Sequence, residues 1–174
     1  MKHSRATIRY AKSLLNLSEE SGVLDTSYND MVLINSICST SKDFSSLLKT
    51  PIVKTDLKVK IINELFSNTI SSLSLAFIIL ITNKKRENLL PEISTSFISL
   101  YKNKKNIQEV SVTTALPLDD SMRKELMSYV KAQNNSNIEL IEKVDESLIG
   151  GAIITIGDKQ LDTSISSMLH ALRQ

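Results

Sequence analysis

Residues 144–172 read VDESLIGGAIITIGDKQLDTSISSMLHAL and hold three of the protein's four glycines. These glycines bracket the apolar run AIITI, so they either hold a phosphate or turn a strand. A phosphate-binding loop curls consecutive backbone N–H groups around an anion, leads into a helix and usually contributes a lysine. The nearest approach to such a loop is Gly151 to Gly157 followed by Asp158. Its spacing is wrong by one residue, and the carboxylate of Asp158 would repel a phosphate.

The strand interpretation fits the same segment better. Residues 152–156 are apolar and rich in β-branched side chains, which favours extended backbone. Gly150 and Gly151 would bend the chain into this strand, and Gly157 with Asp158 would turn it out again. Asp162 is then expected to begin a final helix, because apolar residues follow it at helical spacings. The segment therefore predicts a structural role for its glycines.

Outward from this segment, the second half of the chain alternates strand and helix patterns. Val110, Val112 and Thr114 alternate with polar residues, as is typical of a strand. Asp119 is expected to cap a helix, and residues 138–144 to form another strand. With the strand and helix described above, the order is β-α-β-β-α, which predicts a small mixed domain.

The first half of the chain has helical periodicity and no strand signal. The segments expected to be helical are 4–21, 24–40, the stretch from Thr55, 71–83 and the stretch around Pro91. Leu57, Ile61 and Leu65 repeat every four residues, a short turn is expected at 44–49, and the strongly apolar 71–83 helix is expected near the centre. We therefore expect a mainly α protein with a small α/β part, in which an N-terminal six-helix antiparallel bundle precedes the mixed domain.

Charge also divides the chain near residue 105. Residues 1–105 carry 15 Lys and Arg against 9 Asp and Glu, whereas residues 106–174 carry 6 against 10. Such a split fits two domains with different partners, although two solvated surfaces can also differ in this way by chance. The polar stretch NKKN supplies a junction. We expect domains at 1–105 and 106–174.

The sequence contains no pattern typical of a catalytic or metal-binding site. Cys38 is the only cysteine, which excludes an intramolecular disulfide and a Cys-rich metal site. His3 and His170 lie near opposite ends of the chain, and Asp162 is better explained as a helix cap than as a metal ligand. We predict no catalytic residue, no metal ligand and no cofactor.

The opening segment closely resembles the C-terminal signature of the delta subunit of F-type ATP synthases, called the oligomycin-sensitivity-conferring protein in mitochondria. The matching positions are Asp145, Ser147, Leu148, Ile149, Gly150, Gly151, Gly157, Asp158, Asp162, Ser164 and Leu169. RYAKSLL, TPIVKTDLKVKIINELF and KKRENLLPEISTSF resemble other segments of that family. Thr163 stands where the family commonly has Gly, and Thr155 where a basic residue is common, which leaves open whether the C-terminal contacts are conventional.

The resemblance implies a non-catalytic stator subunit, present in one copy per complex. In that family the helical domain captures the N-terminal helix of an alpha subunit on the catalytic head, and the C-terminal domain meets the b-type peripheral stalk. The head-binding groove lies between the first and fifth helices. The candidate walls here are Tyr10, Ser13, Leu14 and Leu17 on one side, and Ala76, Ile79, Leu80 and Asn83 on the other. The same apolar residues can equally belong to the bundle core.

Alternatives to this interpretation concern the partner and the location. A generic protein-binding or RNA-binding adaptor could use the basic helical domain, although the stretches NKKR and KNKK lack the interleaved aromatics of nucleic-acid surfaces. The early cations Lys2, Arg5, Arg9 and Lys12 resemble a transit peptide, but they run on into a periodic helix. The longest apolar run, 73–81, is too short to span a bilayer. We therefore expect a protein at the cytoplasmic face of a bacterial inner membrane, attached only through its complex, rather than one in a mitochondrion or chloroplast.

Overall fold

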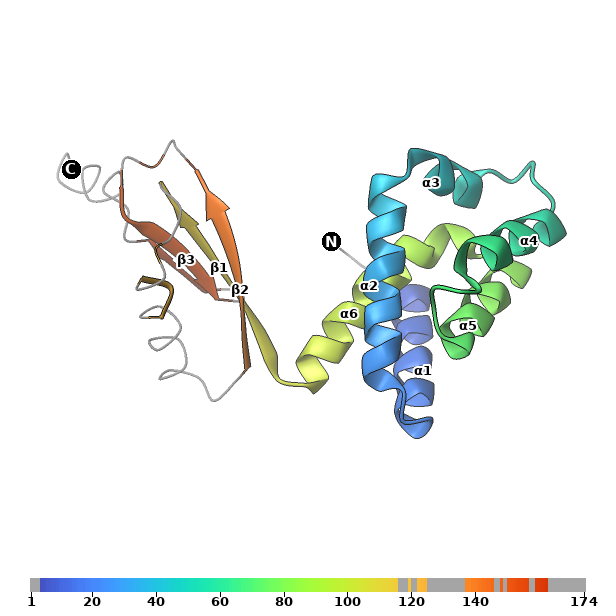
Figure 1. Cartoon of the computed structure of the whole chain (residues 1–174), viewed down its shortest axis with the longest axis horizontal. Coiled ribbons are helices and arrows are strands. Elements are labelled where there is room, and N and C mark those ends of the chain that lie inside the picture. The colour runs from blue at the N-terminus through green and yellow to red at the C-terminus, as the bar shows by residue number, and fades with distance from the viewer. Residues whose placement is uncertain are drawn as a thin grey trace. The chain divides into compact units, whose positions relative to one another are not determined.

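The computed structural model describes residues 4–115, 119, 122–124, 137–145, 148, 150–156 and 159–162. It divides the chain into two compact units, Met1–Tyr101 and Lys102–Gln174. The first is helical and the second contains a small mixed sheet (Figure 1). The mainly helical fold class with a small α/β part, expected from the sequence, is thereby confirmed.

Six α-helices and one 3-10 helix form the described part of the first unit. Their bounds are α1 Arg5–Glu20, α2 Leu24–Thr40, α3 Lys42–Lys49, α4 Thr55–Phe66, α5 Ser72–Asn83, η1 Glu87–Leu89 and α6 Leu90–Lys104, the last three residues of α6 belonging to the second unit. Ser4, Ser41 and Ser71 cap α1, α3 and α5, because each hydroxyl accepts an N–H bond from the first turn. The sequence predicted only a short turn where α3 lies. This prediction was wrong because α3 buries just Phe44 and Leu48, too few positions to show a period.

Helix α4 turns a different face to the core from the one that its leucine repeat suggests. Lys58, Ile62 and Phe66 are buried, whereas Leu57 is 52% exposed and Leu65 is 53% exposed. Both sets of residues repeat every four positions, so only packing against other helices decides which row is internal. Thr55 has a side chain of the kind that commonly caps a helix, but it is the first helical residue, and Lys54 holds the cap position.

Helix α5 is apolar around most of its circumference, yet it is not enclosed. Ile78 and Ile81 are fully buried, but Ala76 is exposed and Leu80 is 48% exposed. A helix that is apolar all round normally lies inside a protein. The expectation that this helix lies at the centre of the unit therefore needs correction: α5 packs through one face and presents the other to solvent.

The core of the helical unit joins residues from distant parts of the chain. Its fully buried large side chains are Leu14, Met31, Ile34, Ile62, Phe66, Ile78, Ile81, Leu90, Ile93 and Phe97. Polar contacts connect the same helices. The buried carboxylate of Asp30 on α2 accepts hydrogen bonds from the amide and hydroxyl of Ser71, at 3.1 and 2.6 Å, and so fixes the start of α5.

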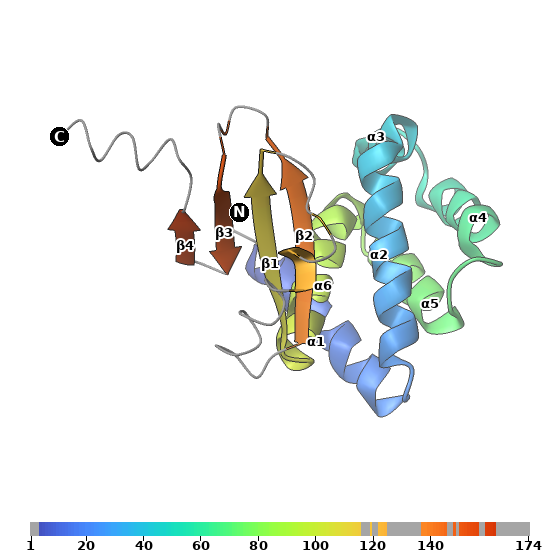
Figure 2. The same ribbon diagram turned by 60° about the vertical axis from the view of Figure 1, so that its left-hand side comes forward.

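The second unit contains a four-stranded sheet in the order β2-β1-β3-β4, visible in Figure 2. The strands are β1 Ile107–Thr114, β2 Asn137–Val144, β3 Ala152–Ile156 and β4 Lys159–Asp162. β1 pairs with β2 in parallel and with β3 in antiparallel orientation. Val110 and Val112 lie in β1, where the alternating pattern predicted a strand, and they are buried against Ile154.

Two helices were expected in this unit, one beginning at Asp162 and one capped by Asp119. Asp162 lies in β4, a strand that the sequence did not predict, opposite Ile153. The helix expected after Asp162 lies outside the described residues. Of the helix expected from Asp119, residues 122–124 are helical, and the amide of Arg123 donates to the carbonyl of Asp119 at 2.9 Å.

Candidate functional site

Helix α1 presents most of its candidate wall to solvent. Tyr10 is half-buried, Ser13 is exposed and Leu17 is 48% exposed. Leu14 differs from them because it is only 1% exposed and belongs to the core of the helical unit. The hydroxyl of Ser13 donates to the carbonyl of Arg9 at 2.9 Å, which leaves little side-chain bulk projecting at this position.

Helix α5 contributes the second candidate wall. Ala76, Leu80 and Asn83 are exposed and Ile79 is half-buried. Their spacing of three, four and seven residues places all four on one helix face. This face is apolar apart from Asn83 and lies opposite the buried Ile78 and Ile81.

The two candidate walls are connected at Tyr10 and Arg86. Nη1 of Arg86 donates a hydrogen bond to the Tyr10 hydroxyl at 3.1 Å, and the guanidinium carbon lies 5.8 Å from the centre of the Tyr10 ring. Sequence reasoning missed Arg86 because it took NKKR for a polar break between helices. The available signal was an arginine that follows one apolar helix together with a tyrosine on another helix, because such a pair can form a cation–π contact.

The backbone after α5 is shaped to place Arg86. Lys85 has a left-handed conformation with φ of 56°, and its amide donates to the carbonyl of Thr82. The Arg86 amide donates to the carbonyl of Ile81, which completes a Schellman motif. Glycine usually fills the left-handed position, and a side chain there costs roughly 1 kcal/mol. The turn therefore changes the direction of the chain directly after α5 and allows the Arg86 side chain to reach Tyr10 on α1.

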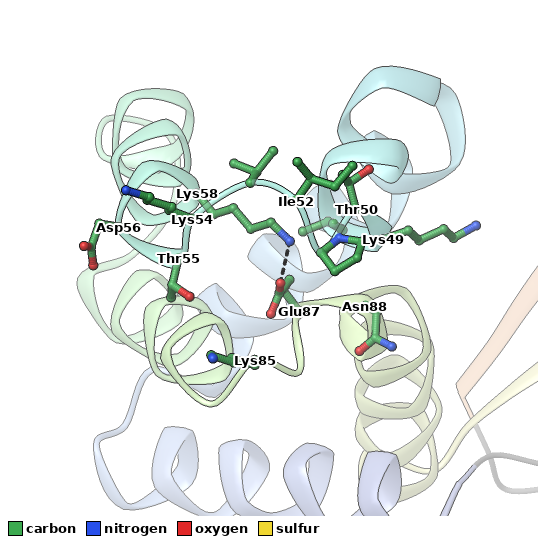
Figure 3. Close-up of a pocket in the computed structure, with 13 residues that line it drawn as sticks. Lys49, Thr50, Ile52, Lys54, Thr55, Asp56, Lys58, Lys85, Glu87 and Asn88 are labelled. Carbon is green, nitrogen blue, oxygen red and sulfur yellow. Dashed lines mark hydrogen bonds and ion pairs between the residues drawn. The ribbon is translucent and has the colours of Figure 1, made fainter.

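A pocket of about 670 Å³ lies between the end of α3, the start of α4 and η1. Figure 3 shows Lys58 reaching from α4 to Glu87, where Nζ lies 2.6 Å from the carboxylate. The Lys58 side chain is 3% exposed and that of Glu87 is 13% exposed. In the same view the Lys49 ammonium points away from this pair. The lysines of the pocket do not converge on one point, so we assign the pocket a structural role.

Two buried titratable side chains of the helical unit have raised pKa values. Burial raises the pKa of the Cys38 thiol to about 11, which keeps it protonated and unreactive at neutral pH. Burial and a 2.7 Å hydrogen bond donated to Asp25 raise the pKa of Tyr101 to about 12. The ring of Tyr101 also stacks on that of Tyr28 with 4.0 Å between their centres.

Charged groups in the second unit stabilise its parallel strand pair. Glu109 and Glu139 are directly opposite in the β1–β2 register, which by itself is repulsive. Lys102 pairs with both carboxylates. Burial alone would lower the pKa of Lys102, but the hydrogen bonds to the two glutamates raise it. Arg123 donates to both oxygens of Glu142, at 2.6 and 3.0 Å, and these bonds lower the pKa of that carboxyl.

Three signature residues of the second unit lie at backbone junctions, namely Asp145 after β2 and Gly150 and Gly151 before β3. The amide of Asp145 donates to the carbonyl of Thr114 at 2.9 Å, next to the end of β2. Gly150 and Gly151 form the bend before β3, and Gly151 has a φ of 85°, which favours glycine. The signature positions Ser147, Ile149, Gly157, Asp158, Ser164 and Leu169 lie outside the described residues, whereas Leu148 is buried and Asp162 lies in β4.

The part of the chain that the structure describes has neither a site for a metal ion nor a membrane-spanning helix. There, no three His, Cys, Asp or Glu side chains gather closely enough to hold a metal ion. Within the same residues, no helix combines the length and apolar character needed to cross a membrane.

Comparisons with known proteins agree along the whole chain. The family model described as ATP synthase delta (OSCP) subunit matches residues 6–174. A protein named ATP synthase subunit delta from Cytophaga hutchinsonii is 36% identical, over 99% of this chain and 94% of that protein. Another protein named ATP synthase subunit delta, from Chlorobium phaeobacteroides strain BS1, is 32% identical, over 99% of this chain and 96% of that protein. A chain in the mitochondrial ATP synthase hexamer of Toxoplasma gondii shares the fold, with a TM-score of 0.77 and 17% sequence identity. The match covers 98% of this chain and 96% of that chain.

Leu17 on α1 and Leu80 on α5 are exposed apolar side chains. The matches along the chain define its class, which is that of a non-catalytic subunit of a larger assembly. The chain belongs to the ATP synthase delta (OSCP) subunit family. It is a structural subunit of the stator, and the chemistry of ATP synthesis takes place elsewhere in the enzyme.

Proposed function

We propose that the helical unit binds the N-terminal helix of an alpha subunit on the catalytic head. The binding surface, here called the α1–α5 surface, consists of Tyr10, Ser13, Leu17, Ala76, Ile79, Leu80 and Asn83. Leu14 lies beneath it as core. An amphipathic helix binds such a surface through apolar side chains spaced three, four and seven residues apart.

One observation carries this proposal. Leu17 on α1 and Leu80 on α5 are each 48% exposed, on two helices that are tied together by the Tyr10–Arg86 contact. Fully burying a leucine side chain contributes about 1.5–3 kcal/mol, so these half-exposed residues retain substantial binding free energy for a partner. Small neighbours, Ser13 and Ala76, allow a partner backbone to approach closely.

The second unit would then meet the b-type peripheral stalk, with one chain per complex. In this arrangement the helices of the first unit form the six-helix antiparallel bundle of the family, with the domain boundary near residue 105. Contacts with head and stalk reinforce each other through effective concentration, because one chain holds both. The bacterial relatives support a place at the cytoplasmic face of the inner membrane, reached through the complex.

Calorimetric titration of the full chain with a peptide covering the N-terminal helix of the same organism's alpha subunit tests the head contact. We expect saturable one-to-one binding. Leu80→Asp should weaken it by about tenfold or more, because it puts a charge against an apolar helix.

Leu65→Asp is the matched control for this experiment. Leu65 on α4 is 53% exposed, so the two substitutions remove leucines of similar exposure. The control should bind within about twofold of the unaltered chain, since exposed positions tolerate such changes. Equal losses in both variants would contradict the α1–α5 surface, and a folded chain that does not bind the peptide would contradict the head contact itself.

A further inference from the structure

Charge is distributed unevenly along the α1–α5 surface. Arg9 on α1 and Lys84, Lys85 and Arg86 after α5 are all exposed, and the Tyr10–Arg86 contact brings these two groups to one end. Glu20, at the other end of α1, is exposed three residues beyond Leu17. Ten residues of helix separate Tyr10 from Glu20, which is about 15 Å at 1.5 Å per residue. The surface is therefore basic at one end and acidic about three helical turns away.

The basic end is not explained by the stability of α1. The positive end of a helix dipole favours acidic residues in the first turn, whereas α1 has none there and begins with Arg5, followed by Arg9. The left-handed Lys85 adds a local strain at the same end. Both features cost stability, and contacts with a bound partner can compensate for that cost.

Arg86 has the geometry of a receptor for a negative group. Its guanidinium donates one hydrogen bond, from Nη1 to the Tyr10 hydroxyl, and lies over that ring, and the residue as a whole is exposed to solvent. A planar guanidinium held in this way suits a carboxylate or the free carbonyls of a helix C-terminus.

We propose that the partner helix binds in one direction, with its C-terminal end and an acidic side chain at Tyr10 and Arg86. Its N-terminal end then lies beside Leu17 and Glu20. Both ends of the partner's dipole meet charge of the opposite sign, and the partner runs antiparallel to α1. This inference rests on the proposed head contact and adds the direction of the bound helix and the charge at its end.

Nitroxide labelling of the alpha-subunit peptide, first at its C-terminal end and then at its N-terminal end, tests the direction. Amide signals of the isotope-labelled full chain report proximity to the label. The C-terminal label should broaden Tyr10 and Arg86, and the N-terminal label should broaden Leu17 and Glu20. The reverse pattern overturns the proposed direction, whereas absence of any binding overturns the head contact instead.

Charge reversal tests the role of Arg86. Arg86→Glu should weaken peptide binding by about fivefold to tenfold and reduce its dependence on salt. Lys60→Glu, which makes the same charge change at an exposed position of α4, should leave binding within about twofold. A peptide whose acidic residue at the C-terminal end is replaced by lysine should recover affinity for Arg86→Glu. Equal effects of both variants, or no recovery, overturn the assignment of Arg86.

Discussion

Lys58 shows how a single charged side chain is accommodated in a helical core. Its ammonium crosses from α4 to Glu87 and so connects α4 to the segment that precedes α6. One Glu87 oxygen, Oε2, is buried without a hydrogen-bond partner among the described residues. A buried ion pair adds little stability compared with two apolar residues in the same place. A single charge buried there without its partner lowers the stability substantially.

Replacing one partner of this pair should therefore destabilise the protein more than replacing both partners. We expect Lys58→Met to lower the free energy of unfolding by about 3 kcal/mol, because Glu87 is then buried without its partner. The double variant Lys58→Met with Glu87→Leu should recover most of that loss. Urea unfolding followed by circular dichroism measures both, and a double variant as unstable as the single one would contradict the explanation.

Tyr101 gives the helical unit a dependence on alkaline pH. Its pKa is raised from an ordinary 10.0 to about 12, so the folded state holds this proton more tightly than the unfolded state. The associated stability is complete below pH 10 and is lost as the pH rises toward 12. We expect Tyr101→Phe to lose less stability across this window than the unaltered chain. Buried Cys38 acts in the same direction but is present in both proteins, so the difference isolates Tyr101. Identical pH profiles in urea unfolding would contradict this account.

At the scale of single elements, the sequence predicted where helices lie better than which face each one buries. Met31, Ile34 and Cys38 on α2 are buried, and their spacing matches one helix face. On α4 two adjacent rows have the same period, and on α5 nearly every row is apolar. Periodicity cannot rank such rows, because the choice depends on helices that are distant in sequence. The exposed face of α5 is therefore visible only in the structure.

Helix α1 offers a direct test of this distinction between core and surface. Leu14→Asp should unfold the helical unit, because it buries an unpaired carboxylate at a position that is 1% exposed. Leu17→Asp should change stability by less than about 1 kcal/mol, because the side chain is half exposed. Thermal unfolding by circular dichroism at the helical wavelength separates the two, and similar losses in both would contradict the assigned faces of α1.

At the scale of the whole molecule, the candidate site was only partly accessible from sequence. The family signature indicated the class of protein, and seven of the eight candidate wall residues keep some exposure in the structure. Leu14 is core, and Arg86 was missed because its role depends on a contact across 76 residues of chain with Tyr10. The second unit likewise has an extra strand, β4, whose four residues are too few to show a period.

The proposed stator role requires this chain to couple the catalytic head to the stalk, and ATP-driven proton pumping tests that coupling most directly. Membrane vesicles carrying the same organism's ATP synthase would be stripped of this subunit and then supplied with the purified full chain and heads. We expect pumping to return and to saturate at one chain per enzyme, while ATP hydrolysis by free heads is unchanged by the chain. A folded chain that binds the head but restores no pumping would contradict the stator role.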